Sequence, residues 1–419
     1  MFKEDPGHVG ASNTMTMEHK VTVGPGEPSG RAGPDDAGAF SPVENEAPLR
    51  LWRRLHLAPP GGLGVRRRAV LLALVAWLPI VTWALATGRL PGVDGSEGLL
   101  THYGIHARCL IVIPLLILAE AGLHRTGKDI AWQFVASGVV TPALRPGFDA
   151  AIHSVVRLRD ASSPWVFAIG AAIAWAVADA PRATDKEMVW SLGPDGTIGF
   201  GGVWLAYVVR PLLFALLIGW LWRLALVTGW MWRVARLPLA LVPTHPDRTG
   251  GIAFVEKLPG ALALVTFALS TMMASRWAHE VVHHGASLAS FQPALIAHVV
   301  VWSLALLMPI LALAPVLRSA RKNALPAYSA LVGEQGRLVH RRWIERKPVD
   351  DDALLEAPGI GPVADAATLY EAVKRMRTVA IGKHTLQVIL LPMAVPFCLL
   401  ALLSFPVASI LSTLLKVLI

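Results

Sequence analysis

The stretch WAHEVVHHG at 277–285 contains the pattern H-E-x-x-H, formed by His279, Glu280 and His283. On a helix, this spacing places two imidazoles one turn apart with a carboxylate between them in the sequence. Zinc metallopeptidases hold their metal with such a pair and use the glutamate to activate water. The pattern therefore raises one enzymatic hypothesis, a zinc-dependent membrane hydrolase or peptidase with Glu280 as its catalytic residue.

A catalytic zinc site also needs a third protein ligand and one open position. His298, at the start of a later apolar segment, is a candidate, but no spacing requires it to reach the metal. The motif also lies where an apolar segment ends, a level at which amphipathic rings are common. We favour an interfacial polar collar without a cofactor, and keep zinc bound by His279, His283 and His298 as the alternative.

A second motif is LVPTHPDRTGG at 241–251, between two apolar segments. Its prolines favour extended backbone, Asp247 suits an Asx-type turn, and the paired glycines allow positive φ. A tight turn between two helices accounts for all of these residues. The functional alternative is a cytoplasmic loop site in which His245, Asp247 and Arg248 bind an ion or a partner.

Several ionisable residues lie within or at the ends of apolar segments, where they are candidates for function. Arg210 is about eight residues into one segment and Asp179 ends another. Because an unpaired arginine at that depth is costly, we expect an Asp179–Arg210 ion pair. With Arg276 and His106, this pair forms either a structural cluster with snorkelling ends or an outward-facing anion or proton site.

The composition is that of a membrane protein. The 419 residues are 54% hydrophobic and 16% charged, whereas soluble domains carry about 25% charged residues. The two cysteines, Cys109 and Cys398, lie far apart in apolar segments and predict no disulfide framework. The net charge of +9 comes from Lys and Arg beside the apolar segments, which indicates contact with anionic lipid at the cytoplasmic face and no nucleic-acid partner.

The apolar segments predict an all-α polytopic bundle of about seven transmembrane helices, within a range of six to eight. The predicted spans are about 69–87, 107–123, 164–180, 202–234, 259–278, 294–317 and 386–404. Residues 405–419 are too short to span after Pro406, so we expect an interfacial C-terminal helix.

The regions outside the spans divide the chain further. Residues 1–48 are rich in Gly, Pro and acidic residues and predict a disordered N-terminal tail, while 49–58 suit a short interfacial helix. The membrane domain covers 49–317 and 386–419. Residues 318–385 predict a small cytoplasmic insertion of two helices, the second with Leu369, Val373 and Met376 on one face.

The loop charges predict the orientation. With the N-terminus in the cytoplasm, the cytoplasmic segments hold 29 Lys and Arg and the outer loops hold three. This distribution satisfies the positive-inside rule at every turn. It also puts residues 279–283 on the outer face, away from the carboxylates of the cytoplasmic insertion.

Two stretches carry a resemblance. LVPTHPDRTGG after a Trp- and Arg-rich span, with ADAATLYEAVKRMRTVAIGKHTL at 364–386, resembles a group of proteobacterial inner-membrane proteins of uncharacterised activity. The resemblance runs from about residue 50 to the C-terminus. It implies a bacterial inner-membrane location and a multi-span fold, and no biochemical role. H-E-x-x-H is not part of that group's pattern.

The activity stays open between two classes. The leading expectation is a non-enzymatic membrane protein, which either handles a small solute or ion or serves as a membrane-assembly partner. The zinc hydrolase is the alternative, so the sequence does not decide whether the chain is an enzyme. The bilayer is the one partner that it specifies.

Overall fold

The computed structural model of the chain describes residues 40–404, except 60, 92–97, 194 and 349–360. Within these ranges the chain is built of helices and loops, and the one β contact is an isolated bridge between Leu192 and Ile198. The all-α prediction is confirmed. The expected interfacial helix at 405–419 lies outside the described residues, as do residues 1–39 of the expected disordered tail.

Among the described residues, seven helical segments are long and apolar enough to cross a membrane, in agreement with the predicted number of about seven. Each predicted span overlaps one of them, although the span predicted at 107–123 extends to Ala136 and the one predicted at 294–317 ends at Leu311. The segments are α2 (Val65–Ala86), α3 and α4 (Tyr103–Ala107 and Ile113–Ala136), α6 (Ser163–Ala178) after α5 (Arg145–Asp160), α7 and α8 (Phe200–Trp204 and Arg210–Val234), α10 (Ala263–His284) after α9 (Leu258–Ala261), α11 (Gln292–Leu311) and α15 (Lys383–Ser404).

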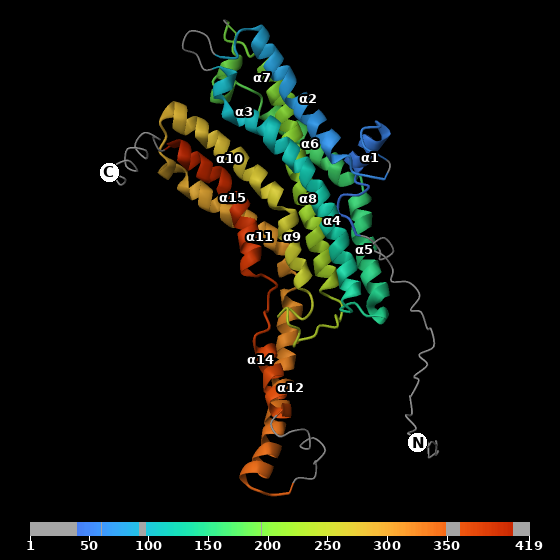
Figure 1. The fold of residues 1–419 in the computed structure, drawn as a ribbon. Helices are drawn as coiled ribbons and strands as arrows, with labels where there is room; N and C mark the ends of the chain where they lie inside the picture. The colour runs from blue at the N-terminus through green and yellow to red at the C-terminus, as the bar shows by residue number, and fades with distance from the viewer. Residues whose placement is uncertain (1–39, 60, 92–97, 194, 349–360, 405–419) are drawn as a thin grey trace, which may run out of the picture.

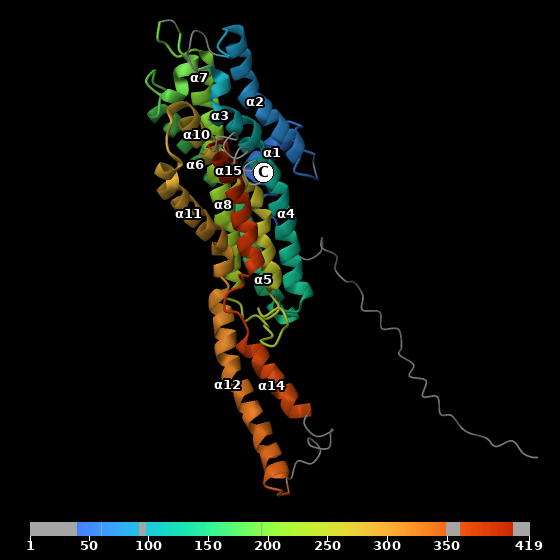
Figure 2. The same ribbon diagram turned by 60° about the vertical axis from the view of Figure 1, so that its left-hand side comes forward.

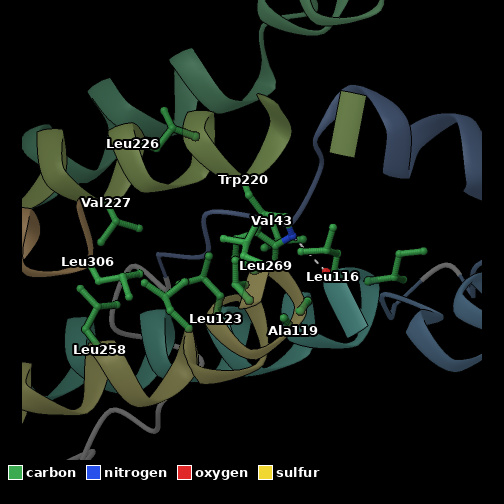
Figure 3. Packing of buried hydrophobic residues seen from close by; sticks show 14 of the residues in the cluster. Val43, Leu116, Ala119, Leu123, Trp220, Leu226, Val227, Leu258, Leu269 and Leu306 are labelled. Carbon is green, nitrogen blue, oxygen red and sulfur yellow. Dashed lines mark hydrogen bonds between the residues drawn. The ribbon is translucent and has the colours of Figure 1, made fainter. Parts of the chain in front are cut away.

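The helices pack into an elongated bundle, in which α4 and α8 run through the centre and α10, α11 and α15 gather on one side (Figures 1 and 2). Leu116 and Leu123 of α4 face Trp220 of α8 in the core shown in Figure 3. The Trp220 indole donates a hydrogen bond to the carbonyl oxygen of Leu116 at 3.1 Å. Large apolar side chains of distant segments thus hold the bundle together by close packing, because lipid tails leave little hydrophobic driving force between membrane helices.

Residues 40–46, which we call the N-terminal strap, correct the prediction of a disordered tail up to residue 48. Phe40 is fully buried with its ring 4.3 Å from that of Trp230, and Ser41 bonds His124 Nδ1 at 2.7 Å. Gly127 of α4 allows this approach, since a Cβ there would lie 3.1 Å from the Phe40 carbonyl oxygen. The polar composition predicted disorder here because it does not show that a few strap side chains contact buried residues far along the chain.

Helix α1 (Ala47–Arg54) follows the strap and overlaps the short helix predicted at 49–58.

A two-helix hairpin projects from one end of the bundle (Figures 1 and 2). Helix α12 (Ala314–Val339) continues through a π-helical turn at His340–Ile344, and α14 (Gly361–Lys374) packs against it. We call residues 314–348 and 361–377 the arm. Of the three residues predicted on one face, Val373 and Met376 are buried, whereas Leu369, one helical turn before Val373, is 41% exposed.

Candidate functional site

The H-E-x-x-H motif occupies the last turns of α10, which ends at Gly285 in the left-handed region with φ +64°. His279 Nδ1 donates to the carbonyl oxygen of Thr101 at 3.0 Å, and its ring stacks on His102 with centroids 4.7 Å apart. The His283 ring packs beside Tyr103. The motif therefore joins the end of α10 to the segment that begins α3.

The structure does not bring the three proposed zinc ligands together. His298 of α11 bonds Ser270 Oγ at 3.0 Å and lies beside Phe397. Ser270 precedes His279 on α10 by nine residues, a rise of about 13 Å along the axis. Glu280 approaches His284 at 3.9 Å. Among the described residues, no group of three or more His, Cys, Asp or Glu is placed to hold a metal ion.

His102 makes this histidine cluster sensitive to pH. Burial, reinforced by the neighbouring His279 and His283, lowers the pKa of His102 from 6.5 to about 3. Between pH 6.5 and about pH 3, His102 is therefore protonated in the unfolded chain but not in the folded protein. The free energy of unfolding falls as the pH drops through this range. Thermal unfolding of the purified protein should show a lower midpoint at pH 5 than at pH 7.5, with a loss of up to about 1.4 kcal/mol per pH unit.

The variant His102→Gln removes this titration and should flatten the pH dependence. His56 is an exposed histidine outside the cluster, so His56→Gln is the matched control. An unchanged slope in His102→Gln would contradict the assignment.

The predicted Asp179–Arg210 pair is present but is not the closest contact. Arg210 Nη1 lies 3.7 Å from Asp179, whose side chain is 60% exposed, while Arg210 Nη2 donates to Glu187 at 2.7 Å. Glu187 also pairs with Arg108. Arg108 opens one π-helical turn, and Arg210 directly follows another at Leu205–Val209. Glu187, which sequence reasoning missed, joins the two distorted helices.

The other two residues of the predicted intramembrane site lie apart from these ion pairs. His106 accepts a hydrogen bond from the Trp77 indole at 3.0 Å and bonds the Leu99 carbonyl oxygen through Nε2. Arg276 is exposed on α10 next to Gly104. His106 and Arg276 thus have contacts of their own, and Gly104 lies between the Arg276 backbone and the Arg108 side chain.

A chain of four buried charges crosses the bundle, and sequence reasoning singled out Glu120 near the inner end of its span but missed the other three residues. Arg68 Nη1 donates to Glu120 at 2.6 Å, and Arg223 Nη2 donates to Glu120 at 2.9 Å and to Glu46 at 2.7 Å. All four side chains are at most 4% exposed. Glu120 and Arg223 lie within apolar segments, and this placement could have indicated buried ion pairs, because a charge inside a membrane requires a partner. We call these residues the buried charge chain.

The loop 241–251 folds around Asp247. This carboxylate accepts hydrogen bonds from the backbone N–H groups of Thr249, Gly251 and Ala253 at 2.8 to 3.1 Å. Burial raises the pKa of Asp247, but these three bonds outweigh it and hold the pKa below its ordinary value. Asp247 is therefore a structural anchor, as the turn interpretation predicts.

Arg248 is exposed, as are Val242, His245 and Pro246, and it has φ +60°, which is uncommon for a residue other than glycine. Its carbonyl oxygen accepts a 2.7 Å hydrogen bond from the backbone N–H of Arg377, at the end of the arm. The Arg377 guanidinium also pairs with Glu256 at 2.9 Å. The loop thus fastens the arm to the bundle.

A pocket of about 460 Å³ lies between this loop and α14. His245 and Arg248 line it from the loop, and Glu371 and Arg375 line it from the arm. Two of the three predicted loop residues therefore face a pocket, while Asp247 is turned into the loop. The pocket is the candidate functional site, since pockets of about 300–1,000 Å³ are typical of small-molecule binding.

Comparison of the chain with protein-family models, with curated proteins and with solved structures yields no match.

Proposed function

We propose that the protein is a non-enzymatic assembly partner of the bacterial inner membrane, which holds a soluble protein with an acidic surface on its cytoplasmic arm. One observation carries this proposal: the arm leaves the bundle as two packed helices and ends in exposed apolar and basic side chains. A solute-handling role would need no such projection.

The location and orientation are part of the proposal. The excess of 29 Lys and Arg over three supports a cytoplasmic N-terminus, and the resemblance of the loop and of 364–386 supports the inner membrane. The arm is then cytoplasmic. The basic residues nearest the helix ends are expected to contact anionic lipid.

The end of the arm is too far from the bilayer to serve as a lipid anchor. From Ala314 to Trp343 the helix rises about 44 Å, at 1.5 Å per residue. In both views it runs away from the bundle rather than along its side (Figures 1 and 2). Interfacial helices bury themselves only about 5–10 Å into the headgroup region. A soluble protein is therefore the partner that fits.

The side chains there have the composition of an interaction surface. Trp343 is 57% exposed and Ile344 69%, and they are flanked by Arg341 and Arg342. Trp and Arg are enriched among the residues that dominate binding energy in protein interfaces. We call His340–Lys347 the basic tip. Four acidic residues at 350–356 follow it in the sequence and lie outside the described residues.

Photo-crosslinking in living cells tests this proposal. A photo-reactive amino acid in place of Trp343 should give one discrete adduct with a soluble protein. The same group in place of Val282, which is equally accessible on the predicted outer side, is the control. The captured protein, once purified, should bind the full chain in nanodiscs at least tenfold more weakly when Arg341 and Arg342 are both changed to Glu, because its acidic surface is then repelled.

Adducts with phospholipid or with the chain itself, or binding that the charge reversal leaves unchanged, would refute the assembly role.

A further inference from the structure

The pocket at the base of the arm has walls from two parts of the molecule. The bundle contributes four loop residues and the arm contributes four residues of α14 and the residue that follows it, in all Thr244, His245, Pro246, Arg248, Ala367, Thr368, Glu371, Ala372 and Arg375. A ligand in this pocket therefore touches both parts at once. Its volume of about 460 Å³ is within the range of small-molecule sites.

Cationic side chains dominate the polar part of this pocket. Arg248 and Arg375 line opposite walls, and Thr244 and His245 add polar groups beside Arg248. The one lining carboxylate is that of Glu371, which lies 3.8 Å from Arg375 and 3.4 Å from Lys374. The Asp247 carboxylate is not a lining group, because it accepts the backbone N–H groups of the loop and lies 2.9 Å from His245 Nδ1.

The apolar part of the lining comes from Pro246, Ala367 and Ala372. These side chains suit a small organic group next to the charged one. The two arginines match a phosphate group, since guanidinium groups recognise phosphate oxygens through paired hydrogen bonds. The short apolar wall favours a phosphate ester over inorganic phosphate.

The backbone of Arg248 is already held in place without a ligand. It is held in the left-handed region by the bonds of the Asp247 turn on one side and by the Arg377 N–H on the other. A site whose groups are already in place loses less conformational entropy on binding. Non-glycine residues held in such a conformation are concentrated at ligand sites.

We propose that this pocket binds the phosphate group of a phosphate monoester, with Arg248 from the bundle and Arg375 from the arm as its two cationic contacts. The ester is either a soluble metabolite or the headgroup of an anionic lipid. Because the ligand bridges the loop and α14, it fastens the arm to the bundle. This site is independent of the soluble partner proposed for the basic tip.

Calorimetric titration of the full chain, in nanodiscs of phosphatidylcholine, tests the site with inorganic phosphate and with glycerol 3-phosphate. Both should bind saturably at one site, and the ester more tightly. Arg248→Gly and Arg375→Gln should each weaken binding at least tenfold. Glycine adopts φ +60° without strain and Arg375 is exposed, so both variants should fold.

Glu371→Gln gives a change in the opposite direction. It removes the carboxylate that competes for Arg375, so it should tighten phosphate binding several-fold. Arg318→Gln, at an exposed position of α12 outside the pocket, is the matched control and should bind like the wild type. If Glu371→Gln binds phosphate more weakly than the wild type, the proposed role of Arg375 is contradicted.

Changing the lipid of the nanodiscs distinguishes the two sources of the ester. If the ligand is a lipid headgroup, phosphatidic acid in the nanodiscs should abolish the binding of glycerol 3-phosphate to the wild type. If the ligand is soluble, that binding should be unchanged; either result supports the site. Absence of saturable binding, or equal binding by the wild type, Arg248→Gly and Arg375→Gln, would overturn it.

Discussion

Replacing Arg223 with methionine should lower the free energy of unfolding by about 3–5 kcal/mol, the range for removing one partner of a buried ion pair. Arg223 is the one cation that contacts both Glu46 and Glu120, and it is almost fully buried. Without it, Glu46 loses its ion-pair partner in the buried charge chain. Denaturant titration of the purified protein in mixed micelles measures the loss.

The matched control for this variant is Arg125→Met on α4. Arg125 is exposed and bonds the carbonyl oxygen of Ala121 within its own helix, so its replacement should cost less than about 1 kcal/mol. Adding Glu46→Gln to Arg223→Met removes the stranded carboxylate and should recover part of the stability. If the double variant is as unstable as the single one, the cost comes from packing and not from charge.

Replacing Asp247 with asparagine should lower the free energy of unfolding by about 3 kcal/mol at neutral pH, since hydrogen bonds to a charged group each contribute about 1.5–3 kcal/mol. The amide nitrogen of asparagine cannot accept the N–H of Ala253, which Asp247 Oδ2 accepts at 3.0 Å. Because the pKa of Asp247 is lowered by folding, its contribution is present above about pH 4 and is lost as the pH falls through the folded pKa. The difference from the wild type should therefore shrink in acid.

Hydrogen exchange adds a local readout to this variant. The backbone N–H of Arg377 bonds the carbonyl oxygen of Arg248, and it should exchange faster once the loop loosens. Asp195→Asn is the control, because Asp195 also closes a turn, onto Thr197, but on an exposed loop. Equal effects of the two variants would show that the Asp247 turn does not hold the arm.

The spans were predictable because the bilayer imposes a local rule. Each needs about 20 consecutive apolar residues, and such runs are visible without knowledge of neighbours. Some helix ends were close, since α6 begins at Ser163 where 164 was predicted, but α4 runs to Ala136 where 123 was predicted. The turn around Asp247 was likewise predictable, because its bonds go to residues two to six positions away.

The buried partners were not predictable, since they join residues that are far apart in the sequence. Glu46 pairs with Arg223 across 177 positions, and Glu187 lies in a polar loop with no periodicity to mark it. Composition assigned Glu46 to a disordered tail and Arg223 to the interior of a span. Only the fold shows that one neutralises the other.

The N-terminal strap has a consequence for the order of assembly. Its residues leave the ribosome before those of α8, yet the side chains that receive Phe40 and Glu46 belong to α8. The strap must therefore wait beside the membrane while four apolar segments are inserted. It then packs against α4, α5 and α8, so the strap can dock only after the first half of the bundle has been assembled.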